Sequence, residues 1–148
     1  MRPALIVGVD TRACALPLPY VIETMRQLPI EPVAGSPPFV LGVSIIRGAP
    51  VPVVDLGVLL GAGTGDASRF VTLRLGDRQV AISVDQVLGV RELETSITQA
   101  LPPLLQGASH DAIEEIGTLD QQMLVVLRAG WQLPVEALAA IASPEGSQ

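Results

Sequence analysis

The sequence has few aromatic residues, one cysteine and one histidine, and these shortages exclude several kinds of site. One Trp, one Tyr and two Phe occur in 148 residues, so the core must be built from aliphatic side chains. Cys14 has no partner for an internal disulfide, and we interpret it as a small buried hydrophobic residue. His110 lies in the polar stretch Gly107–Asp111 and is interpreted as a loop residue. The sequence therefore supports neither a catalytic set around His110 nor a metal cluster.

Charged residues are also scarce, at 16% of the chain, and the formal net charge is −6. No run of basic residues occurs, which argues against nucleic acid and against an anionic membrane surface as partners. No apolar run approaches the roughly 20 residues that span a bilayer. The short apolar run after Met1 reaches Asp10 too early for a secretory signal. We therefore expect a cytoplasmic protein without direct membrane insertion. Because 49% of its residues are hydrophobic, the chain must have a large core or keep apolar surface for a partner.

The most apolar part of the chain predicts a β-hairpin. Phe39–Ile46 and Val51–Asp55 are rich in residues that fit strands, and Arg47-Gly48-Ala49-Pro50 supplies a turn between them. Arg47 then lies at the tip of this hairpin. An arginine keeps its charge and is rarely buried without a partner, so Arg47 is either the solvated end of the hairpin or a residue displayed to a partner.

Alternation of apolar residues predicts further strands on both sides of this hairpin. The predicted hairpins are Leu5–Val9 with Ala13–Leu18, Arg69–Leu75 with Val80–Val84, and Ala112–Thr118 with Gln122–Leu127, and Gln86–Leu93 is a further predicted strand. The Pro-rich stretch from 29 to 38 and the segment containing Pro102-Pro103 predict irregular connections.

Short helices are expected at three places. Tyr20–Arg26 favours a helical turn, Leu56–Leu60 follows Asp55 as a possible cap, and Pro134–Ala142 suits a C-terminal helix. The glycine-rich segment Gly61–Asp66 is interpreted as a linker, because no Gly-Lys-Ser/Thr of a phosphate-binding loop follows it.

An internal repeat becomes visible when the chain is shifted against itself by 66 positions. Leu5, Val7 and Val9 then fall on Val71, Leu73 and Leu75, and the hairpin around Gly42 has a weaker counterpart from Gly117 to Leu127. A repeat of short strands predicts an all-β fold of two small barrels. Each half is small for a stable core, so we expect the halves to pack together as one cooperative unit.

Four stretches of this sequence resemble the CheW family of chemotaxis coupling proteins. They are Leu16–Glu23, Gly42–Leu56, Val80–Val90 and Ile116–Leu127. The second is the most specific, since it resembles the family's Gly-Val-x-Asn-x-Arg-Gly followed by Val-Pro-Val-hydrophobic-Asp-Leu.

This resemblance implies a single CheW-like domain over residues 1–148, made of two intertwined, SH3-like, five-stranded β-barrel subdomains with short helices. It implies no catalysis and no cofactor. It implies an adaptor that couples chemoreceptors to the histidine kinase CheA in arrays at the inner face of the membrane. The receptor tip would lie in an apolar groove between the barrels, and the kinase regulatory domain would dock barrel to barrel.

The resemblance also implies which residues bind partners: Arg47, Gly48, Val43, Ile45, Val21, Glu23 and Val90. Arg47 and Gly48 match the family's Arg-Gly turn, and Val90 matches a position near the receptor groove. Asp55 and Asp85 match family aspartates, which we interpret as structural carboxylates at strand ends or helix caps.

Two departures from the family pattern affect specificity rather than fold. Ile45 stands where the family has Asn, and Arg128 stands where the family often has Asp. Either change could alter which receptor or kinase is recognised, for example in a chemosensory pathway for pilus motility. Two alternatives stay open: a small β-barrel binding module for another protein or an apolar ligand, and an enzyme whose scattered carboxylates meet in the fold.

Overall fold

The computed structural model describes residues 2–61, 67–75, 77–94, 97–100 and 112–128, and most of these lie in strands. The strands are β1 Arg2–Val9, β2 Arg12–Pro17, β3 Val21–Arg26, β4 Val40–Ile46, β5 Ala49–Asp55, β6 Arg69–Leu75, β7 Arg78–Val84, β8 Gln86–Leu93, β9 Thr98–Ala100, β10 Ile113–Leu119 and β11 Gln122–Leu127. The described residues also form a 3-10 turn, η1 Leu18–Tyr20, and one short helix, α1 Leu56–Leu59. The prediction of an all-β fold is therefore confirmed.

Three predicted segments lie wholly or mostly outside the described residues: the C-terminal helix Pro134–Ala142, the connection through Pro102-Pro103, and the linker after Gly61. Among the helices that are described, none has the length and hydropathy needed to cross a bilayer.

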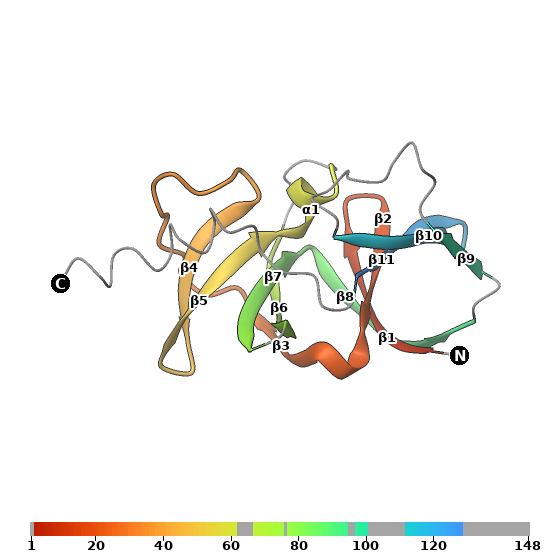
Figure 1. Cartoon of the computed structure of the whole chain (residues 1–148), viewed down its shortest axis with the longest axis horizontal. Helices are drawn as coiled ribbons and strands as arrows, with labels where there is room; N and C mark the ends of the chain where they lie inside the picture. Colours follow the sequence, from red (N-terminus) through yellow and green to blue (C-terminus); the bar gives the residue numbers. More distant parts are fainter. Residues whose placement is uncertain (1, 62–66, 76, 95–96, 101–111, 129–148) are drawn as a thin grey trace.

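The strands form two sheets that lie side by side along the long axis of the molecule (Figure 1). One sheet has the order β8-β1-β2-β11-β10-β9 and the other has the order β3-β6-β7-β5-β4. Both sheets are mixed, because β11 runs parallel to β2 and β5 runs parallel to β7, whereas the other neighbours are antiparallel. The hairpin β4–β5 and the strands β9 and β10 therefore lie at opposite ends of the molecule.

The repeat found in the sequence is present in the strand registers. Val9 pairs with Arg12 in the first half, and Leu75 pairs with Arg78 in the second half, which is the same pairing after a shift of 66 positions. The third strand of each half also pairs with the first strand of the other half. Val21 of β3 pairs with Leu73 of β6, and Val87 of β8 pairs with Val7 of β1. The halves are thus joined by exchanged strands, which makes cooperative folding the expected behaviour.

A bulge occurs at the same place in both exchanged strands. The ladder of β3 skips Ile22, and the ladder of β8 skips Leu88, 66 positions later. An extra residue in one strand bends and twists it locally. Both skipped side chains are exposed, so the bend at each bulge leaves a large apolar residue on the surface.

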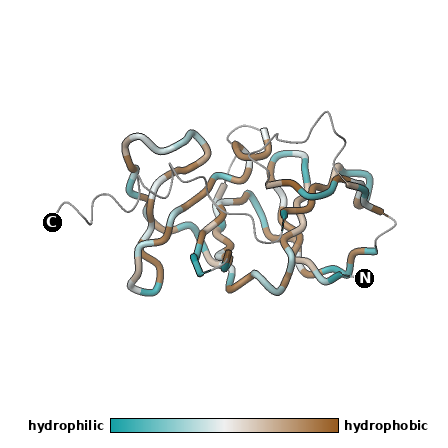
Figure 2. Tube along the Cα trace, viewed as in Figure 1, coloured by the Kyte–Doolittle hydropathy of each residue, from teal (hydrophilic) through white to brown (hydrophobic). Residues whose placement is uncertain are grey.

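Aliphatic side chains fill three clusters, and hydrophobic segments run along the strands of both halves (Figure 2). The largest cluster joins the two sheets, since it contains Val7 and Leu16 of one sheet and Leu73 and Ile82 of the other. Two smaller clusters lie within the individual sheets, one around Ile6 and the other around Phe70. Burial of aliphatic area between the sheets is therefore the main force that holds the halves together.

The sequence prediction for Tyr20–Arg26 was wrong, because Val21–Arg26 is the strand β3 and only Leu18–Tyr20 form a helical turn. The side chains of β3 alternate between half-buried and exposed, which is a strand pattern of period two. Pairing with β6 supplies the backbone hydrogen bonds that a short isolated helix would lack. The local spacing of Val21, Ile22 and Met25 did not reveal this distant partner.

Two turns and one strand also differ from the predictions. The turn of the β4–β5 hairpin consists of Arg47 and Gly48 alone, with β5 beginning at Ala49. The turn between β10 and β11 is likewise shortened, to Asp120 and Gln121. Strand β9 was not predicted, since its residues lie in a polar segment that pairs with β10.

The edge strand β4 is covered by the segment that follows β3. The backbone amide of Val43 donates to the Glu31 carbonyl at 2.9 Å, and the amide of Glu31 donates to the Val43 carbonyl at 2.8 Å. A Cβ on Gly42 would lie 2.1 Å from the Glu31 carbonyl oxygen, and a Cβ on Gly117 would lie 2.1 Å from the Ile97 carbonyl oxygen. Glycine at these two positions therefore allows a neighbouring backbone segment to approach closely, the segment around Glu31 at β4 and the segment around Ile97 at β10.

Candidate functional site

The tip of the β4–β5 hairpin is an exposed two-residue turn. Arg47 has φ of 54° and Gly48 has φ of 81°, as a type I′ hairpin turn requires at both central residues. Glycine adopts this left-handed conformation freely, whereas a side chain such as arginine does so at a cost of about 1–2 kcal/mol.

Arg47 forms a two-pronged ion pair with Glu23 of β3. Its Nη2 donates to Glu23 Oε1 at 2.6 Å and its Nε donates to Oε2 at 3.1 Å. The Arg47 side chain is 76% exposed and the Glu23 side chain is 26% exposed. Because β3 and β4 are opposite edges of the five-stranded sheet, this pair links the two ends of the sheet.

The ion pair shifts both groups toward their charged forms. The hydrogen bonds from Arg47 lower the pKa of Glu23, and the same bonds raise the pKa of Arg47. The Thr72 hydroxyl also donates to the Glu23 backbone carbonyl at 3.3 Å, which ties β3 to β6. The sequence had left open whether Arg47 is simply solvated or displayed. In the structure it is exposed and at the same time held in one orientation by Glu23.

Six of the seven predicted partner-binding residues belong to the five-stranded sheet: Val21 and Glu23 on β3, Val43 and Ile45 on β4, and the turn residues Arg47 and Gly48. Ile45 is 64% exposed, and Val21 and Val43 are half-buried. Val90 belongs to β8 of the other sheet, where it pairs with Leu5 and is 59% exposed. The fold thus brings six of these residues together in one sheet and leaves Val90 on a separate surface.

Asp55 and Asp85 have the structural roles that the sequence predicted. The Asp55 carboxylate accepts a hydrogen bond from the Val58 amide at 3.1 Å and caps α1. The Asp85 carboxylate accepts from the Asp10 amide at 2.8 Å, and the Asp85 amide donates to the Gly8 carbonyl at 3.0 Å. Asp85 therefore fastens the end of β7 to the β1–β2 turn of the other sheet.

A second ion pair at a hairpin tip was not predicted from the sequence. Arg91 of β8 donates to Asp120 at 2.8 Å, and Asp120 lies in the β10–β11 turn. In one sheet the tip supplies the cation, and in the other it supplies the anion. The repeat could have suggested this pair, because β8 follows β7 as β3 follows β2. The positions of the cation and the anion are exchanged between the two pairs, however, and the paired residues do not align in the repeat.

A third cluster joins β1, β9 and β10. The Arg2 guanidinium donates to Glu115 Oε2 at 2.7 Å and to Thr98 Oγ1 at 3.3 Å. This pairing lowers the pKa of Glu115 and raises that of Arg2. The three residues are far apart in the sequence and carry no motif, so only the fold brings them together.

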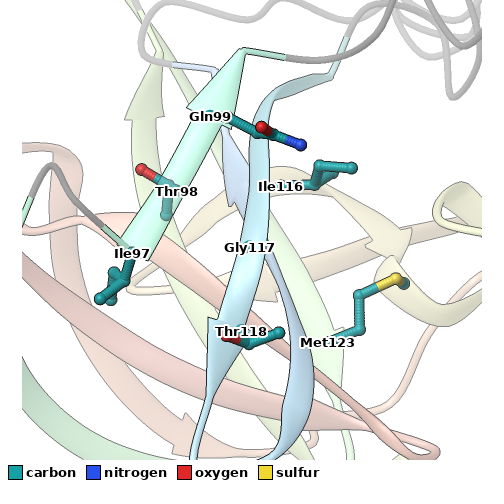
Figure 3. Close-up of a pocket in the computed structure, with 7 residues that line it drawn as sticks. All are labelled: Ile97, Thr98, Gln99, Ile116, Gly117, Thr118 and Met123. Atoms are coloured by element: carbon teal, nitrogen blue, oxygen red, sulfur yellow. The ribbon is translucent and has the colours of Figure 1, made fainter.

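A hollow of about 360 Å³ lies over β9, β10 and β11 (Figure 3). Gln99, Ile116 and Met123 project to the same side of these strands. The described residues that line the hollow are Ile97, Thr98, Gln99, Ile116, Gly117, Thr118 and Met123. None of these lining side chains carries an acid, a base or a strong nucleophile at neutral pH.

The described residues contain no cluster of three or more side chains suited to a metal ion. Cys14 belongs to β2 and its side chain is buried in the cluster that joins the two sheets, and this burial raises the pKa of its thiol to about 12. A buried thiol of this kind is inert, which agrees with the interpretation of Cys14 as a core residue.

Comparison with known proteins supports the resemblance seen in the sequence. No curated protein matches the chain. The fold is similar to that of the scaffolding protein TtCheW from Thermoanaerobacter tengcongensis, with a TM-score of 0.78, 20% sequence identity, and coverage of 92% of this chain and 90% of that chain. The model of the CheW-like domain family matches residues 3–133. Because this match covers more than half of the sequence, the chain belongs to the CheW-like domain family.

Proposed function

We propose that this protein is a non-catalytic adaptor that couples the cytoplasmic tips of chemoreceptors to the regulatory domain of the histidine kinase CheA. Membership of the CheW-like family supports a scaffold role in chemotaxis signalling. The observation that carries the proposal is the Arg47–Glu23 pair, which fixes the family's Arg-Gly turn at an exposed hairpin tip. A rigid, exposed tip loses little conformational freedom on docking.

Two separate surfaces suit an adaptor with two partners. The hairpin tip belongs to the five-stranded sheet, and Val90 belongs to the edge strand of the six-stranded sheet. We assign the tip to the kinase domain and the surface around Val90 to the receptor. An array adaptor at the inner face of the membrane needs both contacts at once, so each surface should be separable by mutation.

Binding measurements with purified partners test this function directly. Isothermal titration calorimetry should detect binding of the protein to a CheA regulatory domain and to a receptor cytoplasmic fragment from the same organism. Val90→Asp should weaken the receptor complex and leave the kinase complex unchanged. If the wild-type protein binds neither partner, the coupling function is refuted.

Arg47→Glu should give a folded protein with weakened kinase binding. The new carboxylate would face Glu23 and push the hairpin tip away from β3, while the exposed site should keep global stability nearly unchanged. Arg91→Glu is a matched control, because it breaks an exposed ion pair of the same kind on the other sheet. A large fall in melting temperature for Arg47→Glu would instead make the pair a structural element of the barrel.

The hollow over β9–β11 favours a second candidate, a binding module for another protein or an apolar ligand. Ile116 and Met123 give it an apolar wall, and Gln99 adds an amide. Filling the hollow with Met123→Trp should abolish such binding. This candidate gains support only if kinase and receptor binding both survive that substitution while another partner is lost.

A further inference from the structure

The two halves of the repeat are built into each other. The first half, residues 2–61, contains β1–β5 and α1, and the second half, from residue 67 to residue 128, contains β6–β11. Among the described strands, four pairings join one half to the other: β1 with β8, β2 with β11, β3 with β6, and β5 with β7. Each sheet therefore contains strands of both halves.

Every hydrophobic cluster of the described residues also draws on both halves. The cluster around Ile6 includes Leu124, and the cluster around Phe70 includes Val53. The large cluster that joins the two sheets likewise contains side chains of both halves. A half without its complement would expose these aliphatic faces to water, at a cost of roughly 25 cal/mol per Å². Each half therefore needs a complement, and a second copy of the chain can supply it.

The ion pairs differ in whether they join the halves. Arg2 and Glu115 come from different halves, and their contact of 2.7 Å links β1 to β10. The ion pair at each of the two hairpin tips lies within one half. An exchange of halves between two copies would therefore keep both tip ion pairs within their own chain and would form the Arg2–Glu115 pair between chains.

The chain passes from the first half to the second through the segment that follows Gly61. Gly61 has φ of +78°, and an added Cβ there would meet nothing within 4 Å. The sequence from 62 to 66 contains two further glycines. Glycine adopts left-handed and right-handed backbone conformations at similar cost. An exchange of halves therefore requires a different chain path after Gly61 and leaves the contacts between the halves as they are.

We propose that two copies of this chain form a dimer by exchanging halves, so that the first half of each copy assembles with the second half of the other. The same contacts hold the monomer and each unit of the dimer, so such an exchange is a low-cost route to a dimer. In the monomer the connection gives the halves an effective concentration of roughly millimolar, so the dimer forms at high protein concentration. The dimer displays each hairpin tip twice. This inference goes beyond the proposed function and does not depend on which partner binds the tips.

Charge-reversal variants of the full-length chain test the exchange. Arg2→Glu and Glu115→Arg each place like charges together in a monomer. In an exchanged heterodimer of the two variants, the native Arg2 meets the native Glu115 in one unit, and the two substituted positions meet with reversed charges in the other. The variants are unfolded together in urea, refolded at about 1 mM, and analysed by native mass spectrometry. We expect the heterodimer to exceed the two homodimers together by at least about tenfold, because both of its units contain an ion pair in place of a like-charge contact.

Arg91→Glu mixed with Asp120→Arg is the matched control. This ion pair lies within the second half, so an exchange cannot bring the two substituted positions together. The control mixture should show no excess of heterodimer over random mixing. Random mixing of the Arg2→Glu and Glu115→Arg chains, an equal excess in the control, or monomers alone in both mixtures overturns the inference. Variants that stay unfolded both alone and mixed also overturn it, because an exchange would restore both ion pairs. Each of these results leaves the coupling function standing, since binding measurements on the wild-type chain test that function separately.

Discussion

Gly42→Ala tests whether the contact between β4 and the segment after β3 helps to hold the five-stranded sheet together. Gly42 has φ of +146°, and an added Cβ would lie 2.1 Å from the Glu31 carbonyl oxygen and 2.9 Å from the Pro32 Cα. Both of these atoms belong to backbone, which cannot rotate away as a flexible side chain would. The substitution must therefore strain the backbone at position 42 or break the two hydrogen bonds between Glu31 and Val43.

The size of the effect follows from two separate contributions. Unfavourable backbone conformation costs about 1–3 kcal/mol, and overpacking against fixed atoms costs about 1–3 kcal/mol. We therefore expect Gly42→Ala to lower the free energy of unfolding by about 2–6 kcal/mol. For a chain of this size the melting temperature should fall by roughly 5–20 °C.

Two other glycines separate these contributions. Gly35 has φ of +82° with nothing within 4 Å of an added Cβ, so Gly35→Ala should show the conformational cost alone. Gly117 meets the Ile97 carbonyl oxygen at 2.1 Å without a left-handed φ, so Gly117→Ala should show the steric cost alone. Urea unfolding followed by far-UV circular dichroism measures all three variants. If Gly42→Ala is no less stable than Gly35→Ala, the segment around Glu31 is not held against β4 and this reasoning fails.

Two further predictions concern ionisable groups. The hydrogen bond from Arg2 lowers the pKa of Glu115 below its ordinary value of 4.5. At a pH near that value the folded protein therefore binds fewer protons at Glu115 than the unfolded chain does. The ionised Glu115 stabilises the folded state at neutral pH, and this stabilisation is lost as the pH falls through the lowered pKa. Glu115→Gln should therefore be less stable than wild type at neutral pH, and its free energy of unfolding should fall less than that of wild type between about pH 5 and pH 3. Urea unfolding at the two pH values measures both falls, and a fall of equal size in the two proteins would contradict this reasoning. Burial raises the pKa of Cys14 to about 12, so a disulfide-exchange reagent at mildly alkaline pH should leave it unmodified until denaturant is added, and rapid labelling of the native protein would show that the sheet opens at β2.

Composition and short-range pattern were enough to establish the class of fold. Alternation over Arg69–Leu75 and Val80–Val84 predicted a hairpin, and the structure has β6 and β7 in those positions. Glycine and aspartate residues in the turns predicted where the strands end. Asp55 likewise predicted the start of the helix α1. These features depend on neighbours along the chain, so a sequence contains all that is needed to find them.

The turn at Arg47 and Gly48 illustrates the limit of that reasoning. The sequence places an arginine at the tip of an apolar hairpin, and the family resemblance marks it as a contact residue. Its bond to Glu23, 24 positions earlier, depends on how the sheet curls. Charge and spacing alone could not choose Glu23 from among the other carboxylates of the chain.

The sequence by itself determined an all-β chain with a repeat, an aliphatic core and an arginine turn matching one family. Only the tertiary structure decided that Val21–Arg26 is a strand, because its partner β6 lies more than forty positions away and belongs to the other half. The exchange of β3 and β8, the two tip ion pairs and the cover over the β4 edge have the same origin. Each joins residues that are far apart in the sequence, and the burial of aliphatic side chains within and between the two sheets decides which distant strands meet.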